Sequence, residues 1–133
     1  MIYAVIDTNV LVSALLSRHP DTATVQVISA ISEKGICPLY NHEIIAEYEE
    51  VLCRPKFAFP LQAVYSILGK IVELGMNTNR VRSSEFFPDP KDIVFYEVAL
   101  SKEDAYHVTG NTKHFPKTPI VVTPAEMLEI LKK

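Results

Sequence analysis

The sequence has few cysteines, and none of its apolar runs is long. Its two cysteines, Cys37 and Cys53, show neither the C-x-x-C spacing nor the neighbouring histidine pair of a zinc site, so we expect both to be reduced and structural. No apolar run approaches the roughly 18 residues that span a membrane, and the first residues have the pattern of a strand instead of a secretion signal. A cytoplasmic protein is the resulting expectation.

The chain also lacks a large excess of charge of either sign. Its net charge of -3 exerts no general attraction on nucleic acids or anionic membranes, so binding to either would need a local basic patch. The 133 residues, 48% of them hydrophobic, suffice for one core, and no repeat, low-complexity tract or linker interrupts them. We therefore expect a single domain over residues 1–133.

Apolar runs and amphipathic segments alternate along the chain. The pattern predicts strands over residues 2–6, 36–40, 79–82, 105–109 and 120–122. It predicts helices, counted with their capping residues, over residues 10–16, 21–35, 41–53, 60–75, 89–102 and 123–133, with a linking segment over 83–88. This alternation indicates a three-layer α/β/α fold with a central parallel sheet of four or five strands and right-handed crossovers.

Asp7 directly follows the apolar run Ile2–Ile6, which has no polar alternation and therefore predicts a central strand covered on both faces. The carboxyl ends of such strands are where open α/β sheets build their sites. Asp, Thr and Asn are also the residues that cap helices, so Asp7, Thr8 and Asn9 have two interpretations. They either begin the next helix or belong to a functional site.

Parallel strands bring other acidic and polar residues to the same edge of the sheet. Glu47 lies in the helix after the second strand, beside its apolar face, and Asn111 follows the fourth strand. Asp89 and Asp92 occupy the cap and first turn of a predicted helix in the run Asp89-Pro90-Lys91-Asp92, which a purely structural helix start also explains. Because Asp89 and Asp92 are expected to lie near Asp7, a role for them in a shared functional site is favoured.

Several carboxylates at one edge repel one another, and each would have a raised pKa unless a cation neutralised them. Ligands that are all oxygen, without a Cys/His set, indicate Mg²⁺ or Mn²⁺. Mg²⁺ is usually held by few carboxylates together with waters and substrate phosphates. The predicted chemistry is therefore hydrolysis of a phosphodiester bond.

Together these residues resemble the PIN domain family, especially its prokaryotic toxin-like branch. The motifs are Asp7-Thr8-Asn9 after an apolar strand, Glu47 in the helix after the second strand, Asp92 at a helix start, and Val108-Thr109-Gly110-Asn111. The similarity extends from Ile2 through Ile120–Glu126 to the terminal helix. It implies a metal-dependent endoribonuclease and the toxin of a toxin–antitoxin pair. An antitoxin protein is then the implied partner, and family analogy favours a homodimer.

In this family Asp7, Glu47 and Asp92 match the catalytic acidic residues that hold Mg²⁺ or Mn²⁺. Thr8, Asn9 and Asp89 would support them. Asn111 aligns with a fourth acidic position and is the departure from the pattern, because an amide oxygen can bind a metal or its water but carries no charge. One-metal catalysis, weaker activity, and compensation by Asp89 or Asp104 are the alternatives, and Asp104 also suits a turn before the fourth strand.

RNA binding requires basic contacts, for which the sequence offers several candidates. The main ones are Arg54, Lys56, Lys113 and His114, with Arg80, Arg82 and Lys91 as further candidates. Each also suits a solvated surface. His114 has no second histidine at ligand spacing, which favours a loop or RNA contact over a metal ligand.

Two other functional classes compete with a nuclease. A phosphatase with an aspartate nucleophile needs a second acid two residues after the first, and Asn9 occupies that position. The second is a PIN-like module that binds RNA or a protein partner without cutting, with Asn111 marking the lost activity. We favour the nuclease because three acidic positions remain for a Mg²⁺ site.

Overall fold

The computed structural model describes residues 1–85, 87 and 89–133, so Phe86 and Pro88 of the predicted linking segment lie outside the described residues. Within this part of the chain, five parallel strands form one sheet in the order β3-β2-β1-β4-β5. The strands are β1 (Ile2–Ile6), β2 (Ile36–Tyr40), β3 (Met76–Asn77), β4 (Tyr106–Val108) and β5 (Val121–Val122). β1 is central, as its unbroken apolar run predicts.

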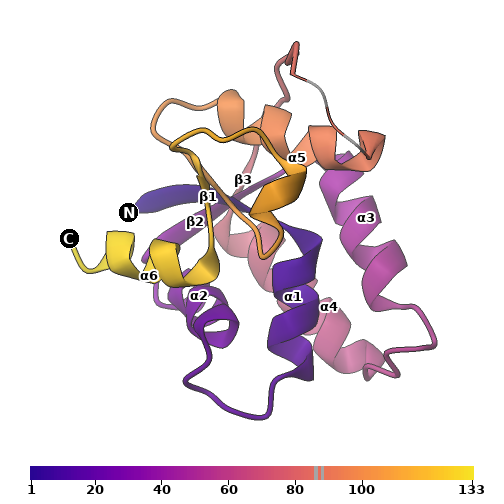
Figure 1. Ribbon diagram of the computed structural model, residues 1–133. Coiled ribbons are helices and arrows are strands. Elements are labelled where there is room, and N and C mark those ends of the chain that lie inside the picture. Colours follow the sequence, from indigo (N-terminus) through magenta and orange to yellow (C-terminus); the bar gives the residue numbers. More distant parts are fainter. Residues whose placement is uncertain (86, 88) are drawn as a thin grey trace.

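Helices cover both faces of this sheet (Figure 1). They are α1 (Thr8–Leu16), α2 (Ala23–Ser32), α3 (His42–Leu52), α4 (Leu61–Leu74), α5 (Pro90–Leu100) and α6 (Pro124–Leu131), with a short 3-10 helix η1 (Thr112–His114). α5 packs against β1, β2 and β4 on one side, and α1, α2, α4 and α6 lie on the other. The predicted three-layer α/β/α fold is confirmed. Among the described helices, none combines the length and apolar character that crossing a bilayer requires.

The core forms around the end of β1. Ala4, Val5 and Ile6 are fully buried, and the buried hydroxyl of Tyr48 on α3 donates a hydrogen bond to the carbonyl oxygen of Ile6. Asn41 fixes the start of α3, because its side chain accepts a hydrogen bond of 2.8 Å from the amide of Ile44. These contacts anchor α3 beside the position where β1 ends and Asp7 begins.

The edge strand predicted over residues 79–82 is wrong, because β3 forms earlier, at Met76–Asn77. α4 ends at Leu74, and Gly75 brings the chain directly against β2. A Cβ atom at Gly75 would lie 2.2 Å from the carbonyl oxygen of Pro38, so the absence of a side chain permits this approach. Pairing with β2 is thus complete before residue 79.

Replacing Gly75 with Ala should destabilise the protein by about 1–3 kcal/mol, since the new methyl group overlaps backbone atoms that cannot move aside freely. Gly69 is the matched control. It lies exposed within α4, and a Cβ atom added there would have no neighbour within 4 Å, so Gly69→Ala should stabilise by about 0.5–1 kcal/mol. Urea unfolding of both variants measures the two effects. Equal effects would contradict the close approach at Gly75.

Candidate functional site

Asp7 lies at the carboxyl end of β1 and immediately precedes α1. Its side chain makes no capping hydrogen bond and is only 9% exposed. Asp7 Oδ2 instead lies 3.1 Å from Nε2 of His107, while the Asp7 amide donates to the carbonyl oxygen of Val108. Helix capping therefore does not account for this carboxylate.

Asn9 connects the first turn of α1 with the loop that follows β4. Its Nδ2 donates to Thr109 Oγ1 at 3.1 Å, and its Oδ1 accepts from the amide of Gly110 at 2.9 Å. Thr109 Oγ1 also accepts from the amide of Asn111. Thr8 differs, because its Oγ1 is buried without a hydrogen-bond partner among the described residues. Neither side chain acts as a helix cap.

The start of α5 contributes two aspartates with different roles. Asp89 Oδ1 accepts a hydrogen bond of 3.0 Å from the amide of Lys91, and Pro90 occupies the first turn. This confirms the structural interpretation of Asp89 as a cap. Asp92 lies in the first turn and faces other charges.

Burial, followed by the negative charges of Asp7 and Asp89, raises the pKa of Asp92 to about 6. His114 acts in the opposite direction, with its Nδ1 3.9 Å from Asp92 Oδ2. The structure therefore brings Asp7 close enough to Asp92 for its negative charge to disfavour ionisation of the Asp92 carboxyl. This repulsion is the electrostatic condition that a bound cation relieves.

Glu47 is not one of the carboxylates that act on Asp92. It is half-buried on α3, and no hydrogen bond or ion pair joins it to another described residue. Its neighbour Tyr48 lies closer to the site: burial, and secondarily the charge of Asp7, raises the pKa of Tyr48 well above its ordinary value. α3 is therefore fixed beside Asp7.

Asn111 lies at the carboxyl end of the parallel strands, as Asp7 does, in the loop between β4 and η1. Its side chain is exposed and does not cap η1. Asp104 lies elsewhere. It precedes β4, at the opposite edge of the parallel sheet, and its φ of 65° places it in a turn. The turn interpretation of Asp104 therefore holds, and compensation for Asn111 by Asp104 is wrong.

The donors at this edge are oxygens, as Mg²⁺ and Mn²⁺ prefer. In the part of the chain that the structure describes, no three His, Cys, Asp or Glu side chains lie together as a metal-binding group. Two carboxylates that repel each other and the unpartnered Thr8 Oγ1 nevertheless suit an ion that is held by few protein ligands and several waters. The residues fit Mg²⁺ or Mn²⁺ in that mode.

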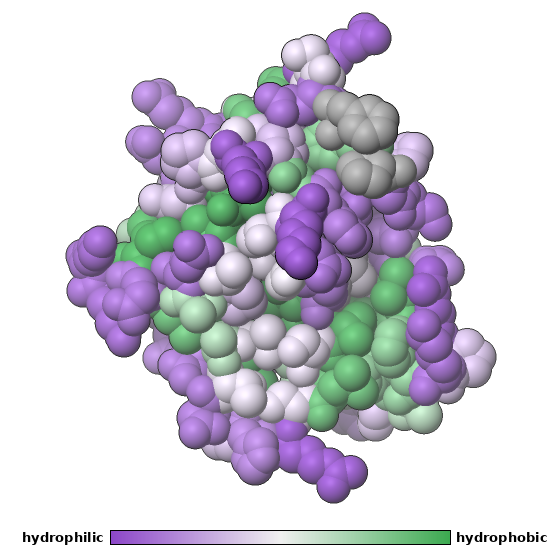
Figure 2. Space-filling model, in the orientation of Figure 1, coloured by the Kyte–Doolittle hydropathy of each residue, from purple (hydrophilic) through white to green (hydrophobic). Residues whose placement is uncertain are grey.

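A groove of about 640 Å³ lies beside these residues. Thr8 and Asn9 form one end, and the remaining lining comes from Val12, Ser13, Leu16, Ser17, Thr22, Val51 and Phe57. Figure 2 shows hydrophobic side chains gathered beside α1 on this face, with hydrophilic ones around η1. An apolar groove thus adjoins the acidic pair.

The basic residues near the groove and η1 differ in how they are engaged. Arg54 Nη2 pairs with Glu50 at 2.9 Å on α3, and Lys56 Nζ lies 5.1 Å from the centre of the Phe57 ring. Lys113 and His114 are exposed on η1, next to Asn111. The positions of Lys113 and His114 are therefore the better suited to meet a ligand at Asp92.

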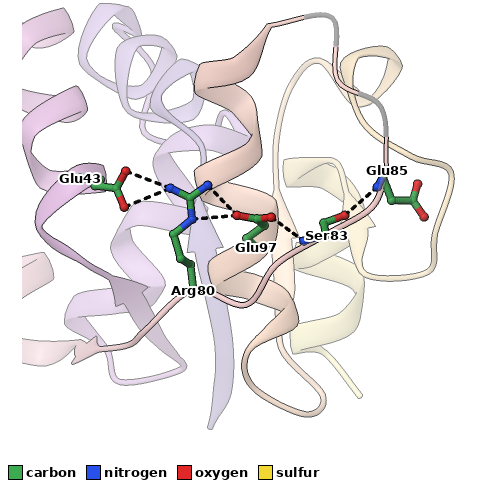
Figure 3. Close-up of polar contacts among 5 residues, drawn as sticks. All are labelled: Glu43, Arg80, Ser83, Glu85 and Glu97. Atoms are coloured by element: carbon green, nitrogen blue, oxygen red, sulfur yellow. Dashed lines mark hydrogen bonds and ion pairs between the residues drawn. The ribbon is translucent and has the colours of Figure 1, made fainter.

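Arg80, also predicted as an RNA contact, is bound within the protein (Figure 3). Its guanidinium pairs with Glu97 on α5 at 2.6 Å and with Glu43 on α3 at 2.9 Å. Glu97 is buried and also accepts a hydrogen bond from the amide of Ser83. Arg80 thus neutralises a buried carboxylate and ties residues 80–83 to two helices.

Sequence reasoning missed two buried charged or titratable residues, His107 and Glu97. Glu97 interrupts the apolar run of α5 between Tyr96 and Val98, and a charge at such a position requires a partner. His107 pairs in register with Val5 of β1, so its side chain shares a face with Asp7, two residues further on. The sequence contains a charged residue within the apolar run of α5 and a histidine within β4. The role of each can be inferred only when the adjacent elements are known.

The raised pKa of Asp92 makes stability depend on pH. An unfolded aspartate ionises near its usual pKa of about 3.9, so between that value and about 6 the folded chain keeps a proton that the unfolded chain has lost. Without metal, stability should therefore fall as pH rises through this window. The advantage of Asp92→Asn over wild type should grow by about 2 kcal/mol between about pH 4.5 and about pH 7.

Urea unfolding of the two proteins in the presence of a chelator measures this difference. Asp89→Asn is the matched variant, since asparagine retains the cap but removes one of the charges acting on Asp92. It should reduce the pH dependence without abolishing it. Parallel pH profiles for wild type and Asp92→Asn would refute the proximity of these charges.

Comparison with known proteins gives one positive result. The family model described as "PIN domain" matches residues 3–113, a span that contains Asp7, Glu47, Asp89, Asp92 and Asn111. We found no match among curated proteins or among solved structures. The matched span covers most of the chain and agrees with the parallel α/β/α architecture. The chain therefore belongs to the PIN domain family, whose members are generally metal-dependent nucleases.

Proposed function

We propose that this PIN domain is a Mg²⁺- or Mn²⁺-dependent endoribonuclease. The observation that carries the proposal is the pairing of Asp7 and Asp92 at the carboxyl end of β1, where burial and mutual repulsion favour a bound cation. We further propose that it is the toxin of a toxin–antitoxin pair, acts in the cytoplasm as one domain, and forms a homodimer. The toxin role and the homodimer follow from family analogy, whereas the cytoplasmic location and the single domain are the expectations from the sequence pattern and length.

Asp7 and Asp92 would hold the cation directly. Glu47 on α3 and the Asn111 amide before η1 would supply further oxygen ligands to the cation or to its waters. When bound, such a cation would lower the pKa of a water that attacks phosphorus and would stabilise charge on the phosphate oxygens. Asn111 reduces the negative charge at this edge, which favours one metal over two.

The protein's own groups hold the substrate and the attacking water in place. Asn9 fixes the loop that carries Asn111 relative to α1 through hydrogen bonds to Thr109 and Gly110. Thr8 would help to position the water, and a carboxylate of Asp7 or Asp92 would accept its proton. Rigid positioning of these groups lowers the entropic cost of the reaction.

The surroundings suit single-stranded RNA. Lys113 and His114 on η1 would contact phosphates near Asp92, and Arg54 and Lys56, in the segment that follows α3, would contact another part of the RNA. The groove that begins at Thr8 and Asn9 has an apolar lining that includes Phe57, which suits an unstacked base. A binding module without activity is the second candidate, favoured by Asn111 at the fourth acidic position.

Purified wild-type protein should cleave single-stranded RNA when Mn²⁺ or Mg²⁺ is added, and a chelator should stop the reaction. Asp7→Asn and Asp92→Asn should each lower the rate by about 100-fold or more, since even outer-shell partners of metal ligands contribute about 10–100-fold. Asp104→Asn is the matched control, because this exposed aspartate lies at the opposite edge of the sheet. It should cleave like the wild type.

The comparison among these proteins separates the two candidate functions. Equal cleavage by wild type and Asp7→Asn would indicate a contaminating nuclease. Metal-dependent RNA retention without any cleavage by the wild type would favour the binding module. Either outcome would defeat the nuclease proposal.

Lys113→Ala should weaken RNA binding and reduce the slope of log affinity against log salt concentration by about 0.7, the value for one lost phosphate contact on a single strand. Binding is measured in the Asp7→Asn background, which prevents cleavage. Lys70→Ala, an exposed lysine on α4, serves as the control and should leave the slope unchanged. An unchanged slope for Lys113→Ala would remove this lysine from the RNA path.

A further inference from the structure

His107 is a fully buried histidine in β4 that no proposed catalytic role uses. Its ring lies nearly parallel to that of Phe95, with centroids 6.2 Å apart, and nearly perpendicular to that of Phe115, with centroids 4.3 Å apart. An apolar residue would fill this space without the cost of burying two ring nitrogens. Packing alone therefore does not explain a histidine at this position.

The hydrogen bonds of His107 identify its tautomer. Nε2 lies 3.1 Å from Asp7 Oδ2, whereas Nδ1 is buried without a hydrogen-bond partner among the described residues. A proton on Nδ1 would have no acceptor, but a proton on Nε2 meets a carboxylate oxygen. We therefore assign the proton to Nε2, which donates to Asp7.

This bond restrains the Asp7 carboxylate on one side. The Asp7 side chain does not cap α1. Among the described residues, its hydrogen-bond partner is His107. With Oδ2 engaged, Oδ1 remains for a ligand. Because His107 is held between Phe95 and Phe115 and its backbone amide donates to the carbonyl oxygen of Ile120, its position is itself fixed.

We propose that His107 is a positioning residue that orients Asp7 for metal binding. The inference rests on the proposed metal site, in which Asp7 is a direct ligand. A donor behind a ligating carboxylate fixes its orientation, and loss of such outer-shell partners typically lowers metal affinity by about 10–100-fold. His107 thus acts through Asp7 and does not contact the substrate.

Two substitutions separate positioning from packing. His107→Leu removes the donor and retains an apolar side chain, whereas His107→Gln places an amide donor near the position of Nε2. The readout is binding of Mn²⁺ alone, followed by the rise in melting temperature during a Mn²⁺ titration and by the paramagnetic resonance signal of free Mn²⁺. Asp7→Asn and wild type are measured alongside.

We expect His107→Leu to melt below the wild-type temperature without metal, because the buried Asp7 carboxylate loses its described donor, and to need about 10–100-fold more Mn²⁺ for half-saturation. His107→Gln should recover most of the lost affinity. If His107→Leu does not fold, His107→Met, which fills irregular space, replaces it. Wild-type Mn²⁺ affinity in the apolar variant, or no recovery in His107→Gln, would overturn the positioning role.

The same titration distinguishes failure of this inference from failure of the proposed function. If wild type and Asp7→Asn bind Mn²⁺ equally, Asp7 is not a ligand, and the metal site itself is overturned. If Asp7→Asn loses binding while His107→Leu keeps it, the metal site stands and only the role of His107 is overturned.

Discussion

Asp7 directly follows a strand whose last three residues are fully buried, and the residue itself is only 6% exposed. A charge at such a position is costly unless hydrogen bonds or opposite charges compensate for lost hydration. The molecule supplies one donor, His107, yet it also places a second carboxylate, Asp92, nearby. The negative charge of Asp7 and Asp92 is thus only partly compensated by the described donors, which is the condition that the proposed cation would relieve.

The elements around this carboxylate are held by specific hydrogen bonds as well as by apolar packing. Tyr48 joins α3 to the last residue of β1, and Asn9 joins α1 to the loop after β4. Arg80 links α3 and α5 further from the site through Glu43 and Glu97. Sequence segments far apart in the chain therefore meet at one edge with little freedom to separate. Such preorganisation is what a positioned reaction requires.

Much of this arrangement could be predicted from the sequence. The unbroken apolar run before Asp7 identifies the central strand, and the order of strands and helices identifies the parallel sheet and its carboxyl edge. The position of β3 could not be predicted, because it depends on how closely Gly75 approaches Pro38. The roles of His107 and Arg80 depend on strand register and helix adjacency, which local patterns do not contain.

The two outermost strands of the sheet, β3 and β5, are each two residues long. An edge this short presents few unpaired amide and carbonyl groups, so another chain has little template on which to add a strand. This disfavours both edge-to-edge aggregation and dimerisation by a continuous sheet. In the homodimer that we propose, contacts between helices would then join the two copies.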